Sequence, residues 1–247
     1  MSETGPEIDV LAEDWQRALC VVAHPDDLEY GAAMAVAKWT AQGKEVAYVL
    51  ATAGEAGIDS MKPEDTGVIR EQEERASAAA VGVDSVTFLG HPDGMLEYGL
   101  SLRRDIAREI RRHRPELLVS INHRDGWTDG AGGTLNQADH RVLGQALIDA
   151  ARDAGNRWVF DELLVEGFEP WGGARMIAFA ASPKPTHGVD VTGHLDAGIA
   201  SLAAHDAYLR NLGGEAFDVA SFLAESAARA GAQLGVEHAV TFEVFAL

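Results

Sequence analysis

A group of side chains that could bind a metal follows the first apolar run of the chain. The run ends in the tetrapeptide HPDD, so His24 is followed closely by the carboxylates Asp26 and Asp27. An imidazole and a carboxylate three residues apart at a strand-to-helix turn can chelate one ion, and a third ligand would leave a position open for water. This pattern indicates a catalytic metal site, although a turn with an acidic helix cap also explains the tetrapeptide.

A third metal ligand is available in the dipeptide Asp139–His140, near the start of a predicted helix. His24, Asp27 and His140 would then form a set of two imidazoles and one carboxylate. Such a set suits Zn²⁺ and also accepts iron, cobalt or manganese. The alternative is that His140 is an ordinary surface residue.

The same HPDD turn argues against a nucleotide cofactor. A dinucleotide site needs the pattern GxGxxG after the first strand, so that backbone can approach a pyrophosphate. Here two carboxylates stand at that turn and would repel a diphosphate. A nicotinamide or flavin cofactor is therefore not expected.

A second HPD tripeptide starts at His91, but its fourth residue is Gly94. The carboxylate that would chelate is missing, so this copy cannot repeat the metal site. Asp93 can still line a pocket and accept a hydrogen bond from a substrate hydroxyl, or it can simply form an Asp-Gly turn.

Short apolar runs alternate with helix-length segments. Strands are expected at 18–23, 45–52, 85–90 and 116–122, and helices at 31–43, 67–83, 100–114 and 136–155. This alternation predicts a Rossmann-like, three-layer α/β/α fold with a largely parallel sheet. Because ligands bind beyond the carboxyl ends of such strands, the polar residues that follow them would converge on one crevice.

The rest of the chain is less regular and adds further strands and helices. Strands are expected at 162–167, 174–182 and 238–247, helices at 193–212 and 218–234, and an active-site loop at 124–133. We expect one domain over residues 1–247, in which residues 1–16 are an N-terminal extension.

Composition restricts the partners. The 20 basic and 39 acidic residues give a net charge of −19, which disfavours nucleic acid and anionic membranes. There is no apolar run of membrane-spanning length and no signal-peptide pattern. The single cysteine, Cys20, cannot form an internal disulfide and is expected to be buried. We expect a cytoplasmic protein that acts on a small molecule; whether it forms a homo-oligomer stays open.

The ordered motifs resemble the LmbE-like family, named after the N-acetylglucosaminyl-phosphatidylinositol de-N-acetylases (PIG-L). The resemblance covers about residues 18 to 210 and rests on the segments VVAHPDDLEYGAAMA (21–35), ATAGEAG (51–57), REQE (70–73), FLGHPDG (88–94), ADHRVLGQALIDA (138–150) and LDAGIASLAAHDAY (195–208). The whole ordered set is far more specific than any one motif.

This resemblance implies a zinc-dependent N-deacetylase. Family members bind one zinc through the residues that match His24, Asp27 and His140, and the residue that matches Asp26 is the general base. Zinc lowers the pKa of a bound water toward ~7 and polarises an acyl oxygen. A nearby carboxylate that does not ligate the metal can take the proton of this water and return it to the leaving amine.

One departure from the family pattern lies at Gln137, where many deacetylases of the family have a histidine. A glutamine can donate a hydrogen bond to an oxyanion, but it cannot shuttle a proton. Either Asp26 serves as both base and acid, or another histidine substitutes. His205 is the first candidate for this role, and His123 and His194 are weaker ones.

The resemblance also suggests residues that contact the substrate. Arg70 reaches the pocket and contacts sugar hydroxyls in the family pattern; otherwise it forms a surface salt bridge with Glu73 or Glu74. Trp127 and Trp171 stand in loops and could stack on a sugar or an aromatic group; otherwise they are packing residues.

Together these features predict hydrolysis of an acetamide on an amino sugar or a glycosylated small metabolite. In this chain the family's late motif has Ala207-Tyr208 in place of Ser-Gln. The resemblance therefore does not assign the substrate-binding residues of this motif. Two alternatives stay open: a hydratase that adds metal-bound water to an unsaturated carboxylic acid, and a non-catalytic binding protein. Specificity would rest on the crevice loops at 54–66, 91–99, 123–136 and 168–190.

Overall fold

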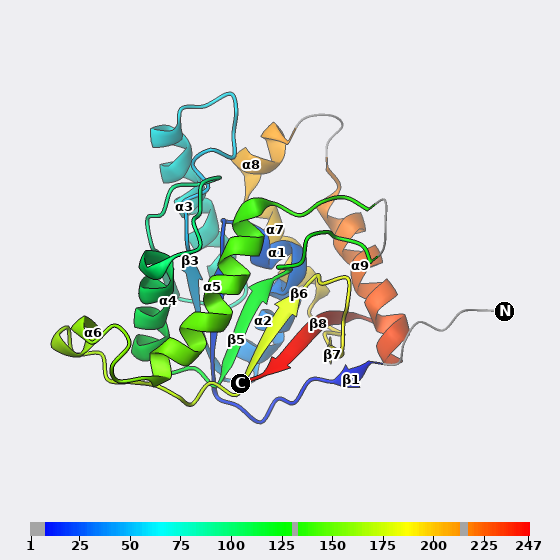
Figure 1. The fold of residues 1–247 in the computed structure, drawn as a ribbon. Helices are drawn as coiled ribbons and strands as arrows, with labels where there is room; N and C mark the ends of the chain where they lie inside the picture. Colours follow the sequence, from blue (N-terminus) through cyan, green and yellow to red (C-terminus); the bar gives the residue numbers. More distant parts are fainter. Residues whose placement is uncertain (1–7, 130–132, 213–216) are drawn as a thin grey trace.

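A computed structural model describes residues 8–129, 133–212 and 217–247, and one eight-stranded sheet forms its centre (Figure 1). The strands are β1 (Asp9–Val10), β2 (Arg17–Val22), β3 (Glu45–Leu50), β4 (Ser85–Phe88), β5 (Leu117–Ile121), β6 (Met176–Ala180), β7 (His187–Asp190) and β8 (Ala239–Ala246). Their order is β1-β7-β8-β6-β5-β2-β3-β4, and β8 runs antiparallel to both of its neighbours while the other pairs are parallel. The predicted α/β fold with a largely parallel sheet is confirmed.

Helices cover both faces of the sheet. They are α1 (Asp27–Gly31), α2 (Ala33–Ala41), α3 (Pro63–Ala80), α4 (Leu100–His113), α5 (Ala138–Gly155), α6 (Glu162–Val165), α7 (Leu195–Ala203), α8 (Asp206–Asn211) and α9 (Val219–Leu234). Helices α4 and α5 pack together against one face, and α1 and α2 lie on the other face, where α7 joins α2 to α3 and α9 (Figure 1). None of the helices in these described segments has the length and apolar character that crossing a bilayer requires.

The central strands are buried along their length, which explains why they appear in the sequence as continuous apolar runs. Leu19, Cys20 and Val21 of β2 and Leu118 and Val119 of β5 have no exposed surface. Strands that are covered by helices on both faces have no polar side to alternate with. Burial also leaves Cys20 a core residue, as expected.

The sheet topology places the functional crevice. Strand β2 pairs with β3 on one side and with β5 on the other, and the chain runs from β2 toward β3 but from β5 toward β6, in opposite directions along the sheet. At such a reversal the loops after neighbouring strands separate and leave a depression at their carboxyl ends. The HPDD turn leaves β2 at this point.

The structure differs from the expected elements in three places. Segment 162–167 is not a strand: it contains the short helix α6, which lies outside the sheet (Figure 1). Its apolar run favoured a buried strand, but only Leu163 is buried in α6, and Val165 is 91% exposed. Segment 193–212 is two helices, which separate at the buried His205. Strand β7 was not expected, and it pairs with β1 from the N-terminal extension.

Candidate active site

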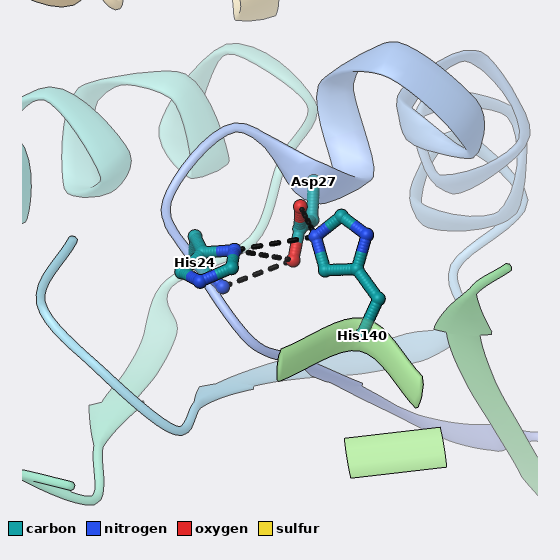
Figure 2. A group of neighbouring side chains, drawn as sticks. All are labelled: His24, Asp27 and His140. Atoms are coloured by element: carbon teal, nitrogen blue, oxygen red, sulfur yellow. Dashed lines mark hydrogen bonds and ion pairs between the residues drawn. The ribbon is translucent and has the colours of Figure 1, made fainter. Parts of the chain in front are cut away.

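His24, Asp27 and His140 converge at the carboxyl edge of β2, although 116 positions separate the two histidines (Figure 2). The first two come from the turn into α1, and His140 comes from the first turn of α5. His24 Nδ1 lies 3.2 Å from His140 Nε2. The Asp27 carboxylate lies 3.6 Å from that His24 nitrogen and 2.9 Å from His140 Nε2. One nitrogen of each ring and the carboxylate therefore face a common centre.

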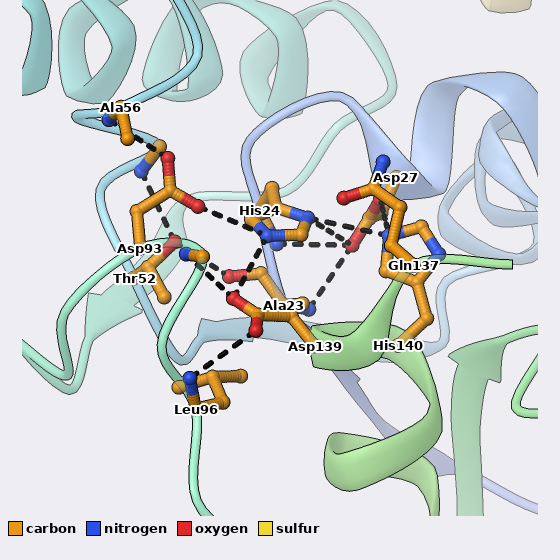
Figure 3. Close-up of polar contacts among 12 residues, drawn as sticks. Ala23, His24, Asp27, Thr52, Ala56, Asp93, Leu96, Gln137, Asp139 and His140 are labelled. Carbon is orange, nitrogen blue, oxygen red and sulfur yellow. Dashed lines mark hydrogen bonds and ion pairs between the residues drawn. The ribbon is translucent and has the colours of Figure 1, made fainter.

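The outer nitrogen of each imidazole is bonded away from this centre (Figure 3). His24 Nε2 lies 3.1 Å from Asp93 Oδ1 and 3.3 Å from Asp139 Oδ2. His140 Nδ1 lies 2.9 Å from Asn136 Oδ1. These oxygens accept the outer N–H groups and leave the inner nitrogens free to coordinate, which is the support that metal-ligating histidines usually have.

Asp27 is held in its ionised form. Burial works against its charge, but the attraction of His140 and His24 outweighs burial and lowers the pKa of this carboxyl group. The backbone N–H groups of Ala23 and His24 also donate to its Oδ2, at 3.0 and 2.9 Å. Two oriented imidazoles and an ionised carboxylate fit a divalent transition metal with open coordination positions.

Asp26 faces a different environment from its neighbour. Its backbone has the left-handed conformation, with φ of 99°, which aspartate adopts only occasionally. Its N–H donates to Glu74 Oε2 at 3.4 Å, and its Oδ1 lies 3.3 Å from Arg70 Nη2. Burial raises the pKa of Asp26 to about 6, although the Arg70 guanidinium opposes this shift. The result is a carboxyl group near the metal centre whose pKa is close to neutral pH.

Arg70 reaches the site from α3 and does not form a surface salt bridge. It is 3% exposed, donates to the carbonyl of Pro25, and lies 4.1 Å from the centre of the Tyr208 ring. The motif after β3 makes room for it: Gly54 has a φ of +63°, and a Cβ there would come within 2.7 Å of the guanidinium. This explains the first glycine of ATAGEAG, Gly54.

A cavity of about 650 Å³ opens over these residues. Asp93, Trp127 and Gln137 also line it. The Trp127 ring stands edge-on to the His140 ring, with 5.8 Å between ring centres. Gln137 precedes α5 directly, and Figure 3 shows it beside His140. The structure thus brings together the three expected metal ligands and places four further expected residues in the same cavity: Arg70, Asp93, Trp127 and Gln137.

A sequence model of the family GlcNAc-PI de-N-acetylase (PIG-L) matches residues 19–151, more than half of the chain. The chain belongs to the PIG-L family. The diacetylchitobiose deacetylase of Thermococcus kodakarensis is 28% identical over 208 residues, 83% of this chain and 75% of that protein. The N,N'-diacetylchitobiose deacetylase of Pyrococcus horikoshii, a solved structure, matches with a TM-score of 0.82 at 25% identity, over 94% of this chain and 85% of that one.

A second curated relative is matched over a smaller share of its length. The 1D-myo-inositol 2-acetamido-2-deoxy-alpha-D-glucopyranoside deacetylase of Kineococcus radiotolerans is 26% identical over 203 residues. The match covers 69% of this chain, which spans about half (53%) of that relative.

His205, from the late motif of the PIG-L pattern, lies outside the cavity. It is fully buried, and its Nε2 lies 3.7 Å from Glu29 Oε1 and 3.7 Å from Glu74 Oε2. This corrects the expectation that His205 replaces the missing histidine at Gln137, because a side chain behind Asp26 does not touch a substrate. Neither of the weaker candidates, His123 and His194, is among the described residues that line the cavity.

Trp171 is also far from the site and is corrected to a packing residue. Its indole N–H donates to the carbonyl of Pro115 at 2.7 Å, just before β5 begins, so it lies at the opposite edge of the sheet. Arg17 and Arg114 lie against its ring, at 5.6 and 5.1 Å from the ring centre. Of the expected loop 124–133, residues 130–132 lie outside the described segments.

Three further residues contact the site, although the sequence did not identify them as members of it. Asp139 accepts the backbone N–H groups of Gly94 and Leu96, at 2.8 and 3.2 Å, besides facing His24. Glu74 holds the Asp26 backbone, and Tyr208 lines the cavity against Arg70. Two of them had a sequence signal: Asp139 directly precedes His140, and Tyr208 stands at a departure from the family motif.

Proposed function

We propose that this protein is a metal-dependent N-deacetylase that hydrolyses the acetamide of an amino sugar or of a glycosylated small metabolite. One observation carries the proposal: a buried set of two imidazoles and one carboxylate lies beside an unligated carboxyl group, Asp26, in one cavity. The relatives, which are named as deacetylases of acetylated sugars, support the same reaction.

His24, Asp27 and His140 would hold one divalent metal ion, which we propose to be zinc. When bound, the metal would polarise the acyl oxygen of the substrate and acidify a water molecule. Asp26 takes the proton of the attacking water and returns it to the leaving amine. Its pKa of about 6 suits both steps, because the group is mostly ionised at neutral pH and still basic enough to accept a proton.

Three further residues of the cavity would act on the substrate directly. The Gln137 amide donates a hydrogen bond to the acyl oxygen as negative charge develops there. Asp93 accepts a hydrogen bond from a sugar hydroxyl through the lone pairs that His24 and Ala56 leave free. Trp127 packs against the sugar ring, while Arg70 orients Asp26 and borders the same space.

The decisive experiment measures acetate release from a panel of N-acetylated sugars and glycosylated metabolites, with the metal content determined on the same sample. We expect one divalent metal per chain, and Asp26→Asn lowering kcat by about 10²- to 10⁴-fold with the metal retained. Full activity of Asp26→Asn would exclude the proposed mechanism. An absorbance change with dienoic acids and no acetate would establish the hydratase alternative, and absence of a stoichiometric metal would favour a binding protein.

A further inference from the structure

The cavity has two chemically different parts. The inner part contains the candidate metal ligands and Asp26, whereas side chains from α1, from the residue after α8 and from α9 form an apolar wall farther out. We define this wall by Tyr30, Leu212 and Phe222, which all line the cavity. The Tyr30 and Phe222 rings meet edge to face, with 5.8 Å between their centres. Leu212 is 45% exposed and Phe222 is 37% exposed, so both still have apolar surface to cover.

The apolar wall continues directly from the reaction centre. Tyr30 lies one turn after Asp26 and Asp27 on α1. Tyr208 borders both parts, because its ring packs on Arg70, which pairs with Asp26, and it lines the same cavity as the wall. A group attached to the sugar whose acetamide lies at the metal site is therefore within reach of the wall.

Charge in the cavity selects against an anionic group at this place. Among the described lining residues, the carboxylates Asp26, Asp27, Asp59 and Asp93 stand against a single arginine. That arginine, Arg70, is 3% exposed and already pairs with Asp26. The proposed metal ion offsets part of this charge only in the inner part, where its ligands lie, so a phosphate or carboxylate on the outer group would find no free cationic side chain among the described lining residues.

We infer that the amino sugar carries an uncharged, apolar aglycone, and that Tyr30, Leu212 and Phe222 bind it. The inference rests on the proposed deacetylase function and narrows its substrate class. An aromatic aglycone suits the wall best, since edge-to-face and offset ring contacts add to the gain from burying apolar surface. Sugars with a phosphate at the same position are poor substrates for the same reasons of charge.

Three probes that differ only at the anomeric carbon test this inference: benzyl N-acetylglucosaminide, methyl N-acetylglucosaminide and N-acetylglucosamine 1-phosphate. We expect the kcat/KM for acetate release to be about 10-fold or more higher for the benzyl than for the methyl compound, and lowest for the phosphate. Phe222→Ala should lower the benzyl value about 10-fold and leave the methyl value within about 2-fold. Phe245→Ala is the matched control, because Phe245 is also 37% exposed and does not line the cavity.

The outcomes separate this inference from the proposed function. Equal kcat/KM for the benzyl and methyl compounds, or a preference for the phosphate, overturns the apolar aglycone while acetate release still supports the deacetylase. An equal loss on both glycosides in Phe222→Ala also overturns it. Absence of acetate from every probe in metal-loaded protein contradicts the proposed function itself. Leu212→Ser is a second wall variant if Phe222→Ala does not fold, and the same selective loss is expected.

Discussion

Asp26 and Asp27 are neighbours in the chain, yet their carboxyl groups have pKa values that move in opposite directions. His140 and His24 lower the pKa of Asp27 against the effect of burial, whereas burial raises that of Asp26. Asp26 has a left-handed backbone conformation, and its side chain pairs with Arg70, whereas that of Asp27 faces His140. Pairs of carboxylates whose environments push their pKa values apart commonly divide catalytic roles, and under the proposed function Asp27 would be a metal ligand and Asp26 the base.

The first prediction at this scale concerns pH. Asp26 must be ionised to accept a proton, and its pKa is raised from 3.8 to about 6. We therefore expect kcat/KM to fall as the pH drops through about 6, because the protonated carboxyl cannot act as a base. A pH profile with the metal content checked at each point measures this. A fall that starts only near pH 4 would contradict it.

The second prediction concerns the carboxylate behind His24. Asp139→Asn should weaken metal binding about 10- to 100-fold, because His24 loses a charged partner at Nε2. A metal titration that follows bound ion against free ion measures the change. The control is Asp105→Asn, which removes a carboxylate that lies 3.1 Å from the imidazole of His91, outside the triad. Unchanged affinity in Asp139→Asn, or an equal loss in both variants, would disprove the role.

At the scale of elements, α3 positions the HPDD turn. Arg70 and Glu74 lie one turn apart on its buried face, and they contact the carboxylate and the backbone N–H of Asp26, respectively. Behind them, Ser77 donates to Glu29 and lies 2.7 Å from Ser201 of α7. The strained conformation of Asp26 is thus supported by contacts from α3, and α3 is in turn held by contacts with α7.

The third prediction follows from this support. Burial and the nearby Glu29 raise the pKa of Glu74 well above its usual range, which favours the uncharged form, and its Oε2 accepts the Asp26 N–H. Glu74→Gln keeps an accepting oxygen and should retain kcat within about 3-fold. Glu74→Leu removes it and should lower kcat about 10- to 100-fold, because small displacements of a catalytic group are costly.

The measurement for the Glu74 variants is kcat at saturating substrate, together with metal content and thermal unfolding. Metal content and thermal unfolding show whether a loss of kcat comes from a displaced Asp26 or from loss of the metal or of the fold. A metal-loaded, folded Glu74→Leu with full kcat would rule out the support by α3. An equal loss in Glu74→Gln would show that the charge of Glu74 matters rather than its accepting oxygen.

At the scale of the whole molecule, the candidate metal site joins segments that are far apart in the sequence. The β2–α1 turn supplies two of the candidate ligands and α5 supplies the third, after strands β2 and β5 at the reversal of the sheet. Residues from α3 and α8 reach the same cavity from the other side. The ion would therefore stabilise the arrangement of these elements as well as take part in the reaction.

The fourth prediction concerns metal removal. A ligand that binds only the folded state, at a free concentration of about 100 times its Kd, raises the free energy of unfolding by about 2.7 kcal/mol. For a chain of 247 residues this corresponds to a Tm increase of about 5–10 °C on metal loading. Calorimetry with and without chelator measures it. Asp27→Asn should show little of this response, and an unchanged Tm on metal removal from the unmodified protein would contradict the prediction.

Much of the site was predictable from local patterns. The spacing of His24 and Asp27 and the strand–turn–helix context of HPDD are short-range features, and the alternation of apolar runs with helices indicated the α/β fold. His140 could be added because parallel strands bring their carboxyl ends together. Such inferences succeed where secondary-structure periodicity and sheet geometry determine the position of a residue.

Only the tertiary structure decided what surrounds these residues. The sequence did not show that Glu74 supports Asp26, that His205 lies behind the cavity, or that Phe222 of α9 faces Tyr30 of α1. The expected strand at 162–167 was wrong for the same reason. Burial and the contacts between distant segments depend on how helices pack across the sheet, and neither composition nor spacing records that packing.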